Sequence, residues 1–163
     1  MSDSPSIELP ADVTCLETGL TYDEFQVGQR FLTATRLVDQ AAVAAFAEVS
    51  GDDNPVHLDP AYARRTFFRG VVAHGALTQA VATGLGWRTG IFKDTLIAIA
   101  ENNAAYKKPV RPGDELRVVF EVLEHEADPP PKWGHVRFGL TVLNQEDEVV
   151  ALGTWYCLVR RSR

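Results

Sequence analysis

The chain has 163 residues, a length that suits one domain with a hydrophobic core of its own. Hydrophobic residues make up 45% of the sequence and charged residues 23%, which excludes disordered and fibrous proteins. The formal net charge of −6 argues against nucleic acid as the main partner, because phosphate binding needs a clustered basic surface.

The cysteines and the ends of the chain indicate a cytoplasmic protein without a membrane partner. Cys15 and Cys157 lie far apart and match no disulfide or metal-binding spacing, which is typical of a reducing compartment. The sequence begins without the basic and apolar regions of a signal peptide, and no apolar run approaches the roughly 20 residues that span a bilayer. The arginines at the other end, Arg160, Arg161 and Arg163, are interpreted as a solvated tail.

The chain is predicted to begin with an irregular arm, a strand and a helix. Residues 1–20 contain Ser, Pro and acidic residues without periodicity and predict an N-terminal arm. Residues 29–38 alternate with β-branched and aromatic side chains, which predicts a strand. Residues 40–50 predict a helix that Asp39 caps and Gly51 ends. The core face of this helix is expected to consist of Val43, Phe46, Ala47 and Val49.

A turn-rich segment and a buried helix are predicted next. Residues 51–60, GDDNPVHLDP, are interpreted as a rigid loop rather than a helix, because Pro55 restricts its own φ and the residue before it. The pair Asp59–Pro60 predicts the start of a short helix that continues over 61–65. A longer helix is predicted over 75–87, where small and apolar residues lie almost all the way round and indicate burial by the surroundings.

Strand patterns dominate the rest of the chain. Turns are predicted at 111–114 and 144–147, and an exposed loop at 128–131, where three prolines follow Asp128. Helices grouped before strands indicate an α+β domain over residues 21–163. An antiparallel sheet curved around one apolar helix is the hot dog fold, although periodicity alone does not distinguish it from other α+β layouts. The absence of an internal repeat argues against a double hot dog. The predicted strands are 95–110, 114–126, 134–145 and 148–161.

Asp52 and His57 are candidate catalytic residues, with Asn54–Pro55 between them. A carboxylate and an imidazole turned toward one water molecule would form a general acid/base pair suited to near-neutral pH. The spacing alone leaves two alternatives open, an Asx turn for Asp52 and a structural role for His57. Asp53 and Asp59 are interpreted as structural, the first as a solvated neighbour and the second as a helix cap.

Gly75 is a candidate oxyanion donor, because it opens the apolar helix. The first N–H groups of a helix have no partner within it and can stabilise developing negative charge. The alternative is that Gly75 only permits close packing. Metal binding by His57 and His74 is not expected, because no nearby acid or cysteine completes a ligand set in the sequence.

These motifs together resemble those of the MaoC-like dehydratase family. Residues 46–59, FAEVSGDDNPVHLD, with the continuation into His74–Gly75, closely resemble its hydratase 2 motif. Further matches lie at 27–31 and 108–114, so the resemblance covers most of residues 22–160. The resemblance implies a hot dog fold, assembly into homodimers or multiples of dimers, and reversible hydration of trans-2-enoyl thioesters to (R)-3-hydroxyacyl thioesters. It implies no metal and no cofactor besides the thioester carrier of the substrate.

The resemblance also implies roles for individual residues. Asp52 and His57 match the catalytic aspartate and histidine of the family. Gly75 matches the glycine whose N–H faces the thioester oxygen, and Asn54 matches the motif asparagine, to which we assign loop support. Asp53 falls at a variable position and is not expected to act in catalysis.

Two other functions of the same fold are alternatives to hydration of an acyl-CoA. A thioesterase would need a carboxylate on or near the central helix, and residues 75–87 contain none. A non-catalytic acyl-binding hot dog would be expected to lack Asp52 or His57, and both are present. The sequence leaves open the length and branching of the acyl chain, the choice between CoA and acyl-carrier protein, and which residue of the pair is the base.

Overall fold

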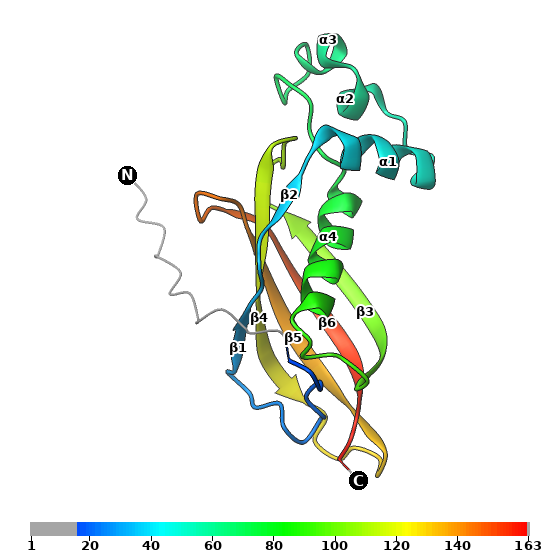
Figure 1. Ribbon diagram of the computed structural model, residues 1–163, viewed down its shortest axis with the longest axis vertical. Coiled ribbons are helices and arrows are strands. Elements are labelled where there is room, and N and C mark those ends of the chain that lie inside the picture. The colour runs from blue at the N-terminus through cyan, green and yellow to red at the C-terminus, as the bar shows by residue number, and fades with distance from the viewer. Residues whose placement is uncertain (1–15, 163) are drawn as a thin grey trace.

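One antiparallel sheet and one long helix organise the computed structural model, which describes residues 16–162 (Figure 1). The strands are β1 (Arg30–Leu32), β2 (Arg36–Val38), β3 (Leu96–Tyr106), β4 (Asp114–His125), β5 (Trp133–Leu143) and β6 (Val149–Arg160). The helices are α1 (Gln40–Ser50), α2 (Pro55–Leu58), α3 (Pro60–Ala63) and α4 (Gly75–Arg88). The grouping of helices before a run of antiparallel strands confirms the α+β prediction.

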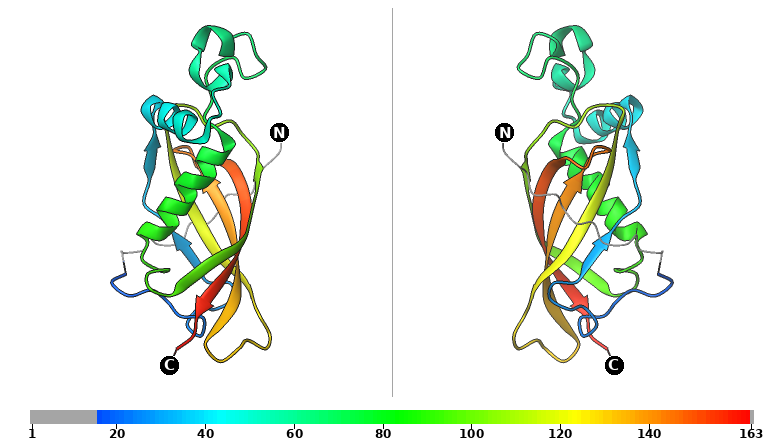
Figure 2. Two further views of the ribbon diagram at one scale, coloured as in Figure 1. Left: turned by 90° about the vertical axis from the view of Figure 1, so that its right-hand side faces the viewer. Right: turned by 90° about the vertical axis from the view of Figure 1, so that its left-hand side faces the viewer.

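The sheet has the order β1-β4-β5-β6-β3, with β2 paired beside β1 on β4, and it curves around α4 (Figure 2). Side chains of β5 alternate between buried and half-buried, as expected of a sheet with one face on the core. Its inner face meets Leu77, Val81 and Leu85 of α4 in a single core with Phe120 and Phe138. This arrangement confirms the predicted hot dog fold.

The central helix is buried on one side only, which corrects the expectation of burial all round. Leu77, Val81 and Leu85 recur every four residues and lie on the buried face. Ala76, Ala80 and Gly84 follow the same spacing on the other side and are exposed. The curved sheet covers half of the helix, and no other element within residues 16–162 covers the rest.

The strand predicted over 29–38 is divided into β1 and β2, so that prediction was wrong in its continuity. Both pieces pair with β4, where Leu32 lies opposite Val119 and Arg36 lies opposite Leu116. The chain advances four positions from Leu32 to Arg36, whereas β4 advances only three between the two partners. The extra residue interrupts the ladder as a bulge does. The Thr33 hydroxyl compensates by accepting a hydrogen bond from the main-chain N–H of β4 at 2.9 Å.

Helix α1 begins and ends where the sequence predicted. The Asp39 carboxylate accepts a main-chain N–H of the first turn at 2.8 Å, and Gly51 ends the helix with a φ of 74°. Val43 and Ala47 are buried as predicted, but Val49 is 82% exposed. Val49 lies two residues past Ala47, about 200° round the helix axis, and therefore points away from the core.

The predicted turns are present, and the C-terminal tail is better ordered than expected. Gly113, with a φ of 107°, lies in the turn before β4, and Asp147, with a φ of 61°, lies in the turn between β5 and β6. Residues 128–131 form no helix or strand. Arg161 is not simply solvated, because its guanidinium donates to Asp23 at 2.7 and 3.0 Å. Arg163 lies outside the described residues.

Residues 16–20, the described part of the predicted N-terminal arm, lie against the end of α4 and the segment after it. The N–H groups of Leu16 and Leu20 donate to the carbonyls of Thr89 and Ile91 at 3.1 and 2.9 Å. The rest of the arm and Cys15 lie outside the described residues. Cys157 is buried and has a free thiol. No helix within residues 16–162 is long and apolar enough to cross a membrane.

Candidate active site

The candidate catalytic residues lie on the segment that leads from α1 into α2, at the end of the molecule where the short helices extend beyond the sheet (Figure 1). The Asn54 side chain accepts the Val56 N–H at 3.2 Å and caps α2, which agrees with its assigned role in loop support. Asn54 is extended, with a φ of −51° and a ψ of 124°, as the following proline requires.

His57 lies on a helical turn, which corrects the interpretation of this segment as loop throughout. Pro55 occupies the first position of α2, where a proline loses no intrahelical hydrogen bond and its fixed φ suits a helix. The capping Asn54 and this proline together start a four-residue helix. The turn directs the His57 ring away from the helix toward the strand-like segment at Val72.

A main-chain carbonyl selects the tautomer of His57. Nδ1 of His57 lies 2.7 Å from the carbonyl oxygen of Val72. Because a carbonyl only accepts hydrogen bonds, Nδ1 carries the hydrogen, and in the neutral ring Nε2 has the free lone pair. His57 therefore offers Nε2 as the atom that can take or give a proton.

His74 is the residue of this site that the sequence did not assign. Its ring is 2% exposed, and Nε2 lies 2.9 Å from the main-chain oxygen of Asp52. One face of the ring stacks on His57, with 3.7 Å between centroids and 29° between planes. Phe46 of α1 packs on the ring at 5.0 Å. The signal available in the sequence was its place directly before the glycine that opens the helix.

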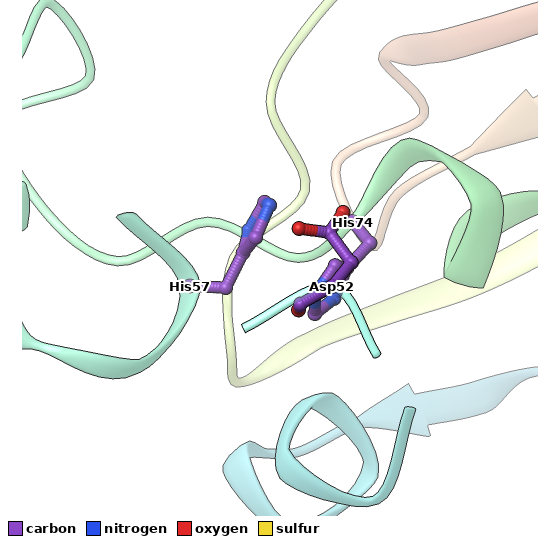
Figure 3. A group of neighbouring side chains, drawn as sticks. All are labelled: Asp52, His57 and His74. Atoms are coloured by element: carbon purple, nitrogen blue, oxygen red, sulfur yellow. The ribbon is translucent and has the colours of Figure 1, made fainter. Parts of the chain in front are cut away.

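Asp52, His57 and His74 come together although they lie on three different segments (Figure 3). One carboxylate oxygen and one nitrogen of each ring lie within 4.8 Å of one another. The expectation that no acid lies near the two histidines was therefore wrong, because the acid is Asp52 itself. Asp53 is exposed beside this group and is not part of it.

The geometry of this group fits hydrogen-bond chemistry better than metal binding. A zinc ion binds a histidine in the plane of its ring, at about 2.0–2.1 Å from the nitrogen. The rings of His57 and His74 are stacked, so their planes run side by side rather than converging on one point. One nitrogen of each ring also faces a main-chain carbonyl. The absence of a metal in the working protein stays a prediction.

Gly75 is the first residue of α4, as predicted, and its N–H has no acceptor within the helix. A Cβ added at this position would lie 2.6 Å from the ring of Tyr106 on β3. Gly75 therefore permits a close approach of that ring, as the packing alternative required. The two roles are compatible, since the N–H and the position of a Cβ are different parts of the residue.

A cavity of about 540 Å³ opens beside two of the candidate site residues. His57 and Gly75 border it together, with apolar walls from Val72 and Val110. Its outer part is bordered by Phe67 and Lys107. An apolar cavity with a few polar groups that converge is the form expected of a small-molecule site.

Phe67 and Phe68, which line the cavity, belong to a loop that is also basic; we call this loop the basic rim, and the sequence analysis missed it. Phe67 is 94% exposed, and Arg64, Arg65 and Arg69 on the same loop are exposed without an ion pair among residues 16–162. The guanidinium of Arg111 holds the loop by donating to the carbonyls of Phe68 and Val71 at 2.7 and 3.3 Å. The signal was three arginines around two phenylalanines in an acidic chain.

Comparisons with known proteins agree with this fold. The uncharacterized protein YdeM of Bacillus subtilis is 35% identical over 146 residues, 85% of this chain and 98% of that protein. The (R)-specific enoyl-CoA hydratase of Aeromonas caviae is 34% identical over 111 residues, 68% of this chain and 81% of the hydratase. The crystal structure of a MaoC-like dehydratase from Rhodospirillum rubrum is similar with a TM-score of 0.81 and 34% identity, over 89% of this chain and 99% of that one.

The model of the MaoC like domain matches residues 24–141, which include Asp52, His57, His74 and Gly75. This range covers the larger part of the chain and all of the candidate site. The chain therefore belongs to the MaoC-like dehydratase family.

Proposed function

We propose that this protein catalyses the reversible hydration of a trans-2-enoyl-CoA to a (R)-3-hydroxyacyl-CoA. The observation that carries the proposal is that His57, with Nε2 free, lies close to the Asp52 carboxylate and lines one cavity together with Gly75 at the start of α4. The similarity to the hydratase of Aeromonas caviae supports the substrate and the stereochemistry.

In this proposal the water molecule lies between the Asp52 carboxylate and Nε2 of His57. One of the two removes a proton as the water oxygen bonds to C3 of the enoyl group. The electron pair of the double bond then moves onto the thioester oxygen as an enolate, and a proton delivered to C2 completes the addition. The Nδ1 hydrogen bond to Val72 keeps the His57 ring oriented through both proton transfers.

The Gly75 N–H stabilises the enolate oxygen in this scheme. A preorganised main-chain donor of this kind lowers the barrier by about 3 kcal/mol. The macrodipole of α4 adds a positive field at the same end of the helix, and α4 is 14 residues long. The thioester itself acidifies the α-carbon, so the scheme uses no redox cofactor and no metal.

The basic rim supports CoA as the carrier of the acyl group. The nucleotide of CoA has phosphate groups that suit arginine side chains and a base that can stack on an exposed aromatic ring. Arg64, Arg65 and Phe67 present these two kinds of group on one loop, and Phe67 and Lys107 line the cavity. The His57 and Gly75 end of the same cavity would then receive the thioester.

A panel of substrates tests the proposal. The purified protein is assayed with enoyl-CoA thioesters of different length and branching, and the configuration of the product is determined. Hydration to the (R)-product is expected, with a lower kcat/KM for the matching pantetheine thioester, which lacks the nucleotide. Absence of hydration and dehydration across the panel would overturn the proposal.

Asp52→Asn provides the matching active-site variant, and its kcat is expected to fall by roughly 10²–10⁴-fold. Asp53→Asn changes the neighbouring exposed carboxylate and is expected to keep the kcat of the wild type. Equal activity in both variants would remove Asp52 from the mechanism.

We further propose that two copies pair through β3. This strand is 11 residues long and forms one edge of the sheet, whereas the other edge is the three-residue β1. A long exposed edge strand invites pairing with another strand. Sedimentation velocity is expected to give a dimer, or a multiple, that Ile97→Lys on β3 weakens. Leu37→Lys on β2 is the control, because Leu37 and Ile97 are similarly exposed, at 52% and 49%. A fully active wild-type monomer in the micromolar range would contradict the pairing.

A further inference from the structure

We propose that His74 is a positioning residue that fixes Asp52 and His57 relative to each other, an inference that builds on the hydratase proposed above. Among the described residues, His74 is the side chain that both hydrogen-bonds to Asp52 and stacks on the His57 ring. The catalytic geometry therefore depends on a buried ring that itself borders no part of the cavity.

The first contact fixes the backbone at Asp52. Nε2 of His74 donates to the Asp52 carbonyl oxygen at 2.9 Å, across 22 positions in the sequence. The Asp52 side chain is exposed, and its one hydrogen bond within the described chain is a long one, 3.4 Å from the Asn54 N–H. The direction of the carboxylate thus depends mainly on where the backbone is held, and His74 holds it.

The second contact fixes the His57 ring from the side. The Val72 carbonyl holds Nδ1 of His57 at one point, about which the ring could still tilt. Stacking on His74 at 3.7 Å removes that freedom, because the two ring faces are in van der Waals contact. Phe46 packs on His74 and limits its movement. The result is a column of three rings from α1 to α2.

A positioning role explains the contacts of His74 better than proton transfer. Its Nδ1 is buried and has no hydrogen-bond partner among the described residues. Nε2 is occupied by the Asp52 carbonyl. With Nδ1 buried and Nε2 donating to a main-chain carbonyl, neither nitrogen of His74 is free to exchange a proton with a substrate at C2 or C3.

The decisive variant is His74→Phe, which keeps a flat ring for the stack and removes the hydrogen-bond donor. A small misplacement of catalytic groups lowers turnover by up to about 10²-fold, so we expect kcat to fall by roughly 10–10²-fold while KM changes by less than about threefold. The pH profile of kcat is expected to change shape, because the carboxylate no longer has its set place beside His57. His74→Gln, which retains an amide donor, should recover part of the loss.

His125→Phe is the matched control. His125 also has a buried nitrogen without a partner and packs on an aromatic ring, Tyr22, at 4.8 Å, but it lies at the other end of the sheet. A purely structural role for His74 would lower thermal stability in both variants and leave kcat per folded molecule and the pH profile unchanged. That result, or a kcat of His74→Phe within about twofold of the wild type, would overturn the proposal.

Amide hydrogen exchange separates this proposal from the hydratase assignment, because it needs no substrate. The amides of Asp53 and Asn54 are expected to exchange faster in His74→Phe and at the wild-type rate in His125→Phe. If the wild type shows no hydratase activity but these amides exchange faster in His74→Phe than in the wild type, the proposed function fails and the positioning role stands. Unchanged exchange in His74→Phe overturns the positioning role whatever the activity.

Discussion

His57, on α2, and His135, near the start of β5, each lie beside an aromatic ring and a carboxylate. Helix α2 and the start of β5 lie at opposite ends of the molecule (Figure 1). His57 stacks on His74 and has the Asp52 carboxylate nearby, yet main-chain carbonyls hold both rings. His135 stacks on Tyr156 at 4.5 Å with 2° between planes, and its Nδ1 bonds directly to the Glu126 carboxylate at 2.9 Å. One end therefore leaves an acid and a base free, and the other joins them to each other.

The difference shows how the same residue types become a reactive site or a structural contact. Oε2 of Glu126 also accepts the main-chain N–H of His135 at 3.0 Å, so this oxygen is held by two hydrogen bonds within the protein. At the other end, backbone groups do the holding. Nε2 of His57 stays available at a cavity, and the exposed Asp52 carboxylate has one long hydrogen bond within the described chain. A buried or half-buried histidine beside an acid is thus a weak signal until its partners are known.

The largest effect is expected when the two histidines are changed in parallel. His57→Gln should lower kcat by roughly 10²–10⁴-fold, because Nε2 is the proton-transfer atom. His135→Gln should keep kcat within about twofold and affect only stability, since it removes a half-buried hydrogen bond to the Glu126 carboxylate. Steady-state kinetics and thermal unfolding measured on both variants check this pair of outcomes.

Non-additivity sharpens the same test. If His57 and Asp52 act on one water, Asp52→Asn combined with His57→Gln should be little worse than the more damaging single variant. A double variant whose losses multiply would mean that the two residues act independently. Loss of turnover in His135→Gln equal to that in His57→Gln would remove the distinction between the two ends.

The next effect in size concerns Gly75, where the structure changes the design of the experiment. Any added Cβ would meet the Tyr106 ring, so a loss in Gly75→Ala reports that collision. Gly75→Pro adds a similar Cβ and also removes the N–H. Proline is tolerated at the first position of a helix, and His74, with a φ of −61° and a ψ of 140°, already has the conformation that precedes a proline.

Gly75→Pro is therefore expected to lose roughly 10²–10³-fold in kcat beyond the loss of Gly75→Ala, with similar thermal unfolding of the two variants. The difference between them, rather than either loss alone, measures the main-chain donor. Equal kcat values for the proline and alanine variants would leave Gly75 with a packing role only and would leave the assignment of Asp52 and His57 intact.

The sequence predicted the features that depend on neighbouring residues. The cap at Asp39, the left-handed end at Gly51 and the turn at Gly113 each follow from a local rule, and all three are present. The strand pattern and the apolar helix likewise follow from periodicity within one segment. The family motif added Asp52, His57 and Gly75, of which the structure brings the first two within 4.8 Å.

The features that sequence reasoning missed depend on contacts between distant segments. The division of β1 from β2 follows from the register on β4, more than 80 positions away. The bond from His74 to Asp52 depends on the course of the chain through α2 and α3. The open side of α4 follows from how far the sheet curves, which composition does not encode.

The smallest expected effect is at the structural end and concerns pH. Hydrogen bonds from the His135 side chain and main chain lower the pKa of Glu126 below its ordinary value of 4.5. Because the folded protein binds the proton less readily than the unfolded chain does, the ionised carboxylate favours folding. This contribution is present above the ordinary pKa and is lost as the pH falls through the lower value of the folded state. Glu126→Gln should therefore lower Tm slightly near pH 7, and the gap from the wild type should close as the pH falls through the lowered pKa of Glu126. Thermal unfolding across this pH range is the measurement, with Glu48→Gln on the exposed side of α1 as the control that shows no such gap.

Turnover gives a second check on the same variants. The kcat near pH 7 should be the same in all three proteins, because this end of the sheet takes no part in the proposed chemistry. A gap in Tm that widened on acidification would mean that the bond between Glu126 and His135 does not stabilise the ionised carboxylate.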